Sequence, residues 1–375
     1  MAASPGTGVA WHDATLAPNN PATVGVNDPV NRETGVLAPT LTPRAIVEYL
    51  DRYVIGQDDA KRIVAVAVYA HFKKIESARR DDHPIAKSNI LLIGSSGTGK
   101  TLLCETLSRV LGVPFVTAEA TTLAQTRFVN EEIEAILQRL VDKADGDLAR
   151  AQCGIVFIDE IDKLKATAGD QPRGGSGESV QHALLKIMEG SPVKLAGGQY
   201  IDTTHMLFIC GGAFVGLGEI IAQTHTYGFI STSEDPDRTK ERILERLNTR
   251  VKPTDLFVFG LIPEFTGRLP IIARFQDLDR EKLVRIMTEP KNSIYNQFRE
   301  IFRNEGAELF IDPKVFREIA ELAVEYKTGA RSLRGIFEEL ITPTLFLVPD
   351  SPDIERVEFT SLFSEPAIAR RSAIR

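Results

Sequence analysis

The sequence is poor in the features that mark secreted and membrane proteins. Only three of its 375 residues are cysteine, and Cys104, Cys153 and Cys210 are spaced too widely for a C-x-x-C pair or a disulfide framework. A reducing compartment is therefore expected. No apolar run reaches the roughly 18 residues that cross a bilayer. The N-terminus has neither the basic start nor the apolar core of a signal peptide. We expect a cytoplasmic protein without a membrane partner.

Positive charge is also in short supply. Lys and Arg number 44 against 51 Asp and Glu, which gives a net charge of −7. This balance argues against broad binding to nucleic acid or to anionic membranes. The length predicts roughly two and a half domains, and the hydrophobic fraction of 43% fits a globular chain with a large core.

The pattern along the chain divides it into four parts. Residues 1–40 hold five prolines among Gly, Ala, Asn and Thr, and are predicted to be a flexible arm. Residues 41–276 alternate short apolar strands with helices, which is typical of a doubly wound α/β domain. Residues 277–362 predict a small, mainly helical domain with one strand near 354–360, and residues 363–375 a C-terminal tail. The strands expected in the large domain are 89–93, 113–117, 154–158 and 206–210.

The strongest motif is Gly-Ser-Ser-Gly-Thr-Gly-Lys-Thr at 94–101, a full match to G-x-x-x-x-G-K-[ST]. It follows an expected strand and opens an expected helix, which is the context of a true phosphate loop. Backbone amides of such a loop face the phosphates, Lys100 reaches the β- and γ-phosphates, and the Thr101 hydroxyl holds Mg²⁺. The predicted ATP-binding residues here are Ser95, Ser96, Gly97, Thr98, Gly99, Lys100, Thr101 and Leu102.

A second motif ends another apolar strand. Residues 155–160 read Ile-Val-Phe-Ile-Asp-Glu, which delivers two carboxylates to the carboxyl edge of a parallel sheet. We expect Asp159 to hold the Mg²⁺ together with Thr101, and Glu160 to polarise the attacking water. The sequence therefore predicts an ATP hydrolase.

These motifs, with others in the same order, resemble the ClpX family of AAA+ unfoldases, the ATP-binding subunits of Clp proteases, over about residues 41–360. The other matches are Val-Ile-Gly-Gln at 54–57, Ser-Gly-Glu at 176–178, Phe-Ile-Cys-Gly-Gly-Ala-Phe at 208–214, Gly-Leu-Ile-Pro-Glu-Phe at 260–265, Gly-Arg-Leu-Pro at 267–270 and Thr-Gly-Ala-Arg at 328–331. The resemblance implies an AAA+ P-loop ATPase fold, a doubly wound parallel sheet followed by a small helical domain. It also implies a homohexamer that uses ATP and Mg²⁺ to thread protein substrates, with a ClpP-like peptidase as partner.

The resemblance gives roles to residues outside the two motifs. Val54 and Ile55 would contact the adenine. Arg268 resembles the arginine finger that reaches a neighbouring subunit's γ-phosphate, the alternative being a salt bridge at a domain boundary. Arg331 resembles the second sensor, which touches the nucleotide from the small domain, the alternative being a solvent-facing arginine at a helix start. The first sensor is not identified, since Cys210 and Gly211 occupy its strand end.

The sequence departs from the family at several places, one of them the family's Arg-Lys-His loop, whose counterpart at 190–202 is short and has Lys194 as its single basic residue. The four-cysteine zinc domain that usually begins these chains has no counterpart, so structural zinc is not expected. The gripping loop Gly-Tyr-Val-Gly is replaced by Arg127, Phe128, Val129 and Asn130; Arg127 either lines the pore or pairs with a nearby glutamate. The peptidase-docking tripeptide is kept only in part, as Tyr227, Gly228 and Phe229, and an ordinary surface loop is the alternative.

Two further functions compete with threading. Loss of the gripping-loop glycines keeps open a nucleotide-controlled assembly or adaptor protein of ClpX ancestry, without processive threading or a peptidase partner. A nucleic-acid motor is disfavoured by the acidic balance and by a single basic side chain in the pore segment.

Overall fold

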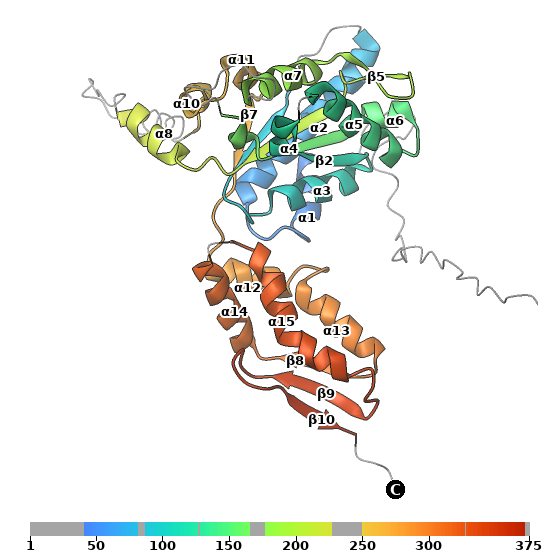
Figure 1. Ribbon diagram of the computed structural model, residues 1–375, viewed down its shortest axis with the longest axis vertical. Coiled ribbons are helices and arrows are strands. Elements are labelled where there is room, and N and C mark those ends of the chain that lie inside the picture. Colours follow the sequence, from blue (N-terminus) through green and yellow to red (C-terminus); the bar gives the residue numbers. More distant parts are fainter. Residues whose placement is uncertain are drawn as a thin grey trace, which may run out of the picture.

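The computed structural model describes residues 41–81, 87–126, 128–165, 177–226, 250–326 and 328–371. They form a large domain and a small domain, joined by the extended stretch 275–279 (Figure 1). The predicted arm 1–40 lies outside the described residues. No helix in the described ranges combines the length and the apolar character needed to cross a membrane.

The large domain is built on a five-stranded, wholly parallel sheet in the order β2-β3-β6-β1-β7. Its strands are β1 (Ile90–Ile93), β2 (Phe115–Glu119), β3 (Ile155–Asp159), β6 (Leu207–Gly212) and β7 (Ile271–Arg274). Its helices are α1 (Pro43–Leu50), α2 (Asp58–Asp81), α3 (Lys100–Leu111), α4 (Ala120–Gln125), α5 (Val129–Lys143), α6 (Leu148–Gln152), α7 (Gly177–Glu189), α8 (Leu217–Thr226), α10 (Pro253–Phe259) and α11 (Pro263–Gly267), with the 3-10 turn η1 (Ile161–Leu164). A short hairpin pairs β4 (Pro192–Lys194) with β5 (Tyr200–Asp202).

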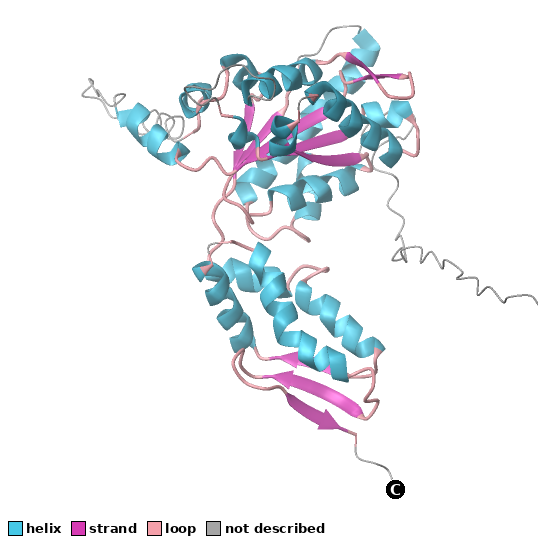
Figure 2. Cartoon of the chain, in the orientation of Figure 1, coloured by secondary structure: helices cyan, strands magenta, loops and turns pink. Residues whose placement is uncertain are grey.

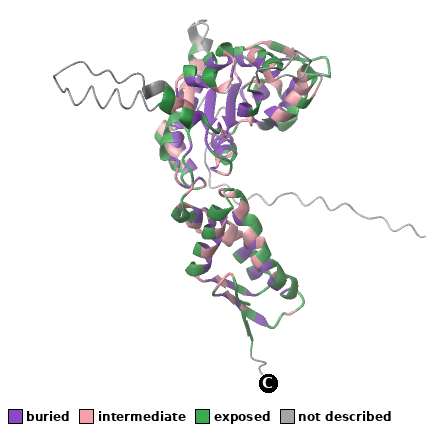
Figure 3. Ribbon diagram, turned by 60° about the vertical axis from the view of Figure 1, so that its left-hand side comes forward, coloured by how far each residue is buried: buried purple, intermediate pink, exposed green. Residues whose placement is uncertain are grey.

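Helices cover both faces of this sheet, which explains why β1 is buried at every position and why β3 is apolar up to Asp159 at its carboxyl end. Alternate side chains of β1 and β3 enter two separate cores. Leu91 and Ile158 pack on one face among residues of α4, α5 and α7. Ile90 and Phe157 pack on the other among residues of α1, α2 and α3. The strands appear as a buried layer inside the domain in Figure 3.

The small domain packs helices on one side of a three-stranded sheet (Figure 2). Its helices are α12 (Arg280–Thr288), α13 (Ile294–Asn304), α14 (Pro313–Glu325) and α15 (Arg331–Leu347). The strands β8 (Glu308–Ile311) and β9 (Ile354–Phe359) are parallel, and β10 (Ala367–Arg370) pairs antiparallel with β9. Three of the four helices start at a side chain that caps a backbone amide, namely Asp279, Ser293 and Asp312.

The predicted architecture, a doubly wound parallel sheet followed by a mainly helical domain, is confirmed. Strands β7 and β8 and the hairpin were not predicted, because each is only three or four residues long and, unlike the equally short β1, is not a fully buried apolar run. Within the stretch treated as a tail, residues 367–370 form β10. Its four residues are all exposed, so no buried alternation marked it as a strand.

Candidate active site

The phosphate loop connects β1 to α3 at the carboxyl end of the sheet. Gly97 and Gly99 adopt φ values of 78° and 98°, a left-handed region that favours glycine, and Gly99 directly precedes α3. A Cβ atom at Gly99 would meet nothing within 4 Å. The amino-terminal end of α3 therefore faces open space, which suits an anion.

Lys100 is buried within this loop. Its Nζ donates to the carbonyl oxygens of Gly94 at 2.5 Å and Ser95 at 3.1 Å. Burial lowers the pKa of Lys100, the carboxylates of Asp159 and Asp162 oppose that shift, and Arg331 adds to it. The ammonium is thus held by backbone oxygens that a phosphate group can replace.

The two residues predicted to hold Mg²⁺ lie side by side. The Thr101 hydroxyl is 3.5 Å from Oδ2 of Asp159, although one follows β1 and the other ends β3. A hydroxyl and a carboxylate oxygen are hard donors of the kind that Mg²⁺ prefers, so the donor set fits the ion.

Glu160 has an unusual backbone, with φ at 59° in the left-handed region. Its amide donates to Oδ1 of Asp159 at 2.8 Å, and its Oε2 accepts a bond of 3.0 Å from the Thr121 hydroxyl. Thr121 lies in α4, the helix that leads to the predicted gripping loop. Glu160, the predicted base, is thereby fixed between Asp159, the predicted Mg²⁺ ligand, and α4.

The segment predicted to contact adenine is tied to the phosphate loop by Gln57. The side-chain amide of Gln57 donates to the carbonyls of Thr98 at 3.3 Å and Gln276 at 2.8 Å, and its Oε1 accepts from the Gln276 amide at 2.8 Å. Val54 and Ile55, just before it, are buried. Three parts of the chain therefore meet at one buried amide: residues 54–57, the phosphate loop and the start of the domain linker.

The small domain contacts the phosphate loop directly. The Ala330 amide donates to the Gly97 carbonyl at 3.2 Å. A Cβ atom at Gly97 would lie 2.4 Å from the Thr328 carbonyl oxygen, and one at Gly329 would lie 2.9 Å from the Ser96 carbonyl oxygen. The contact therefore requires glycine on both sides. It brings the start of α15, with Arg331 as its first residue, to the nucleotide side of the large domain.

Arg268 lies elsewhere. It caps the carboxyl end of α11, and its Nη2 pairs with Oε1 of Glu189 at 2.6 Å. Its carbonyl accepts from the buried side chain of Asn89 at 3.1 Å. Asn89 precedes β1 and the phosphate loop follows β1, so Arg268 lies at the opposite end of this strand from the phosphate loop.

The end of β6 carries no polar side chain that could sense a phosphate. Burial raises the pKa of Cys210 to about 12, which leaves a neutral thiol. A Cβ atom at Gly211 would lie 2.8 Å from the Phe157 ring and 3.1 Å from Oδ1 of Asp159, so no side chain fits there. Asp162 instead accepts from the amides of Ala213 at 3.2 Å and Phe214 at 3.3 Å.

The predicted gripping loop is described in part. Phe128 is 63% exposed, and Val129 opens α5 half-buried against the large-domain core. Asn130 is exposed. Arg127 and the predicted docking residues Tyr227, Gly228 and Phe229 lie outside the described residues.

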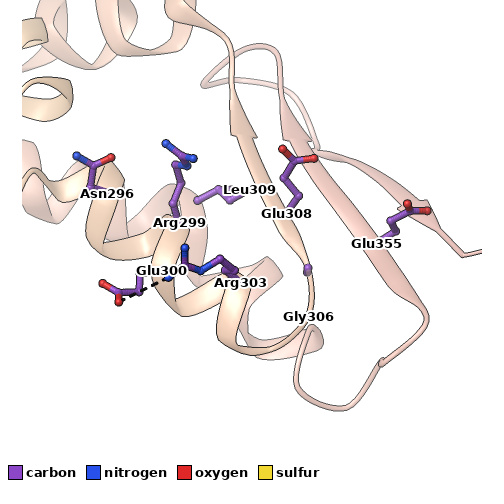
Figure 4. Close-up of a pocket in the computed structure, with 9 residues that line it drawn as sticks. Asn296, Arg299, Glu300, Arg303, Gly306, Glu308, Leu309 and Glu355 are labelled. Carbon is purple, nitrogen blue, oxygen red and sulfur yellow. Dashed lines mark ion pairs between the residues drawn. The ribbon is translucent and has the colours of Figure 1, made fainter.

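A separate cavity of about 630 Å³ lies in the small domain, between α13 and the sheet (Figure 4). Arg299 and Arg303 line it together with Glu300, Glu308 and Glu355. Because the two charge signs alternate around it, this cavity does not favour a single class of charged ligand.

Sequence reasoning missed several polar residues that organise the site. They are Gln57, Thr121 and Asp162, described above, and the buried Gln181 and Asn89 near Arg268. Each makes its bonds to residues distant in sequence, so no local pattern marks it. Only the buried glutamine in the middle of α7 carried a signal, since an uncharged polar residue on an apolar helix face needs partners.

Two family profiles match the chain. The AAA domain, Cdc48 subfamily, matches residues 85–272, and the C-terminal D2-small domain of ClpB protein matches residues 278–358. The chain is also similar to other proteins over most of its length. The ATP-dependent Clp protease ATP-binding subunit ClpX of Bacteroides fragilis is 43% identical over 89% of this chain and 83% of its own. The protein of the same name from Treponema denticola is 44% identical over 82% and 77%, and ClpX 3 of Methylococcus capsulatus is 43% identical over 84% and 78%.

Proposed function

Since the chain belongs to the ClpX family of AAA ATPases, we propose that it is a protein unfoldase that works as a homohexameric ring. In this proposal it hydrolyses ATP at sites shared between neighbours, threads substrate proteins through the axial pore and delivers them to a ClpP-like peptidase. The observation that carries the proposal is the separation of Arg268 from the phosphate loop of its own chain.

That separation can be measured along β1. Asn89 holds the Arg268 carbonyl at one end of the strand, and Gly94 begins the phosphate loop at the other. Five residues of extended chain span about 16 Å. Arg268 is therefore remote from its own nucleotide, while its 52% exposed side chain is available to another chain. A guanidinium suits this role because it stays charged and binds phosphate oxygens bidentately.

Within one chain, different residues carry the separate steps of ATP binding and hydrolysis. Lys100 and the amides of the phosphate loop bind the phosphates, and Thr101 with Asp159 would hold Mg²⁺, which neutralises phosphate charge when bound. Glu160 accepts the proton of the attacking water, and its bond from Thr121 orients the carboxylate. Arg331 stands beside this site on the small domain, so phosphate state and domain angle can affect one another.

An exposed aromatic residue supports threading. Phe128 is exposed directly before α5, and aromatic area can press on a passing chain. The relatives are named as subunits of a Clp protease, which supports a peptidase partner. Tyr227, Gly228 and Phe229 are proposed to dock it.

The test is ATP-dependent unfolding of a tagged fluorescent protein, with and without a ClpP-type peptidase. We expect loss of fluorescence that requires ATP, degradation only when the peptidase is present, and hydrolysis per chain that rises with protein concentration. Phe128→Ala should abolish unfolding and keep basal hydrolysis within about twofold, since the exposed Phe128 is not one of the residues assigned to the nucleotide site. A wild-type chain that hydrolyses ATP as a ring yet unfolds no substrate would favour the nucleotide-controlled assembly protein instead.

A further inference from the structure

Helix α7 spans the large domain between the catalytic carboxylates and Arg268. Its 13 residues measure about 20 Å. Its first residue, Gly177, packs so tightly on Leu164 that a Cβ atom there would lie 2.4 Å from the Leu164 carbonyl oxygen. Its last residue, Glu189, forms the ion pair with Arg268. In Figure 1, α7 and α11 lie next to each other along one face of the domain.

The buried side-chain amide of Gln181 in α7 connects the turn after the catalytic carboxylates to α11, the helix that ends at Arg268. Gln181 is 0% exposed. Its Nε2 donates to the Leu164 carbonyl at 2.8 Å, and its Oε1 accepts from the Ile262 amide at 2.8 Å. Leu164 ends the turn η1, which begins directly after Glu160. Ile262 caps the start of α11, and Arg268 caps its end.

Both bonds of Gln181 are costly to lose. The bond to the Leu164 carbonyl is buried and the bond from the Ile262 amide is partly buried, and a buried backbone group without a partner costs free energy comparable to a lost hydrogen bond. A single planar amide satisfies the two groups at once, so it fixes the distance between η1 and α11.

The carboxyl end of α7 is held just as firmly. The Lys87 Nζ donates to the Ile187 carbonyl at 3.3 Å, and the Asn89 amide donates to the Met188 carbonyl at 3.3 Å as well as to Arg268. The helix is therefore anchored at both ends and cannot easily absorb a displacement of either.

We propose that Gln181 is a positioning residue for Arg268: through α11 it fixes the arginine relative to the turn that follows the catalytic carboxylates of the same chain. The nucleotide site of each chain then determines the position of the arginine that this chain presents to its neighbour. This inference rests on the proposed shared site. It assigns to Gln181 no contact with nucleotide.

The test uses rings in which two inactive chains complement each other. A reporter chain carries Arg268→Ala and keeps its own nucleotide site; a donor chain carries Glu160→Gln and keeps its arginine. Hydrolysis recovered by the mixture comes from reporter sites that face donor arginines. If the mixture recovers none, with mixed rings demonstrated by crosslinking, Arg268 does not act in trans, and both the shared site and this inference are overturned.

Gln181→Met is then added to one chain at a time. In the donor it should lower the recovered kcat by about 10- to 100-fold, because small misplacements of a catalytic group have effects of that size. The KM for ATP should stay within about twofold, since the reporter's Lys100 and Thr101 are unchanged. In the reporter the same substitution should change the recovered rate by less than about threefold.

Two controls complete the design. His182→Ala changes the next residue of α7, whose side chain is 57% exposed, and should leave recovery unchanged in the donor. If Gln181→Met chains fail to assemble, Gln181→Glu replaces them. Glutamate keeps the size of the side chain and the oxygen that accepts from the Ile262 amide, but it places a negative charge against the Leu164 carbonyl oxygen. It should therefore also lower the recovered rate in the donor more than in the reporter. Equal losses in donor and reporter, or no loss in the donor, would overturn the positioning role.

Discussion

The contact between the phosphate loop and the small domain offers a direct test of how nucleotide binding depends on domain position. Gly329 has a φ of 59°, and a Cβ atom there would lie 2.9 Å from the Ser96 carbonyl oxygen and 3.2 Å from two backbone atoms of Gly97. Gly329→Ala therefore places a methyl group against backbone that cannot rotate away. We expect the turn to withdraw from the phosphate loop.

The magnitude follows from two contributions. An alanine in the left-handed region costs about 1 kcal/mol, and the displaced turn loses the Ala330 to Gly97 hydrogen bond, a net contribution of about 1 kcal/mol. If the undocked turn relaxes fully, about 2 kcal/mol shifts the docking equilibrium roughly 30-fold. Because Arg331 begins the helix that this turn positions, nucleotide affinity should fall by up to the same factor.

Fluorescence anisotropy of a labelled ADP measures this affinity. Gly335→Ala is the matched control, since Gly335 lies inside α15 and a Cβ atom there meets nothing within 4 Å. It should bind like the parent and be more stable by about 0.5 to 1 kcal/mol. If Gly329→Ala, with an intact melting transition, binds labelled ADP as tightly as Gly335→Ala, the contact at Gly329 does not control nucleotide affinity.

Three further outcomes are expected. Glu160→Gln should retain labelled nucleotide and slow phosphate release by about 100-fold or more; release at near the parental rate would remove Glu160 as the base. Gln57→Ala, which loses three hydrogen bonds, should weaken nucleotide binding and lower the melting temperature together; an effect on neither would contradict the proposed link. Burial lowers the pKa of His71 to about 4 from 6.5, so the folded state resists protonation, and stability present above pH 6.5 should fall by about 3 kcal/mol as the pH drops toward 4. Urea unfolding across this range should show that slope, His71→Asn should remove it, and the same change at the exposed His182 should not.

Much of the fold could be predicted because its signals are local. The strand ending at Asp159 is a continuous apolar run, and the phosphate loop combines three glycines with the start of a helix, so each is legible within a few residues. The pairing of Thr101 with Asp159 followed from the two motifs taken together, since the loop after β1 and the end of β3 meet at the carboxyl edge of a parallel sheet.

The bonds that organise the site could not be predicted in the same way. Gln57 reaches Gln276, 219 residues later, and Gln181 reaches Ile262, 81 residues later. A glutamine side chain carries no information about which distant backbone group it will satisfy. Strands such as β8 were missed for another reason, since a four-residue segment is too short for alternation to separate it from a loop. The orientation of Arg127 stays a prediction.

The placement of Arg268 and the phosphate loop at opposite ends of β1 also constrains symmetry. Under the proposed shared site, one surface of the chain donates an arginine and a different surface accepts one. A two-fold dimer joins identical surfaces, so it would pair donor with donor or acceptor with acceptor and complete no site. Only head-to-tail contacts complete sites. An open row of such chains always leaves one acceptor without an arginine, whereas a closed ring leaves none. Ring closure by itself therefore raises the activity of the chain at the open acceptor end.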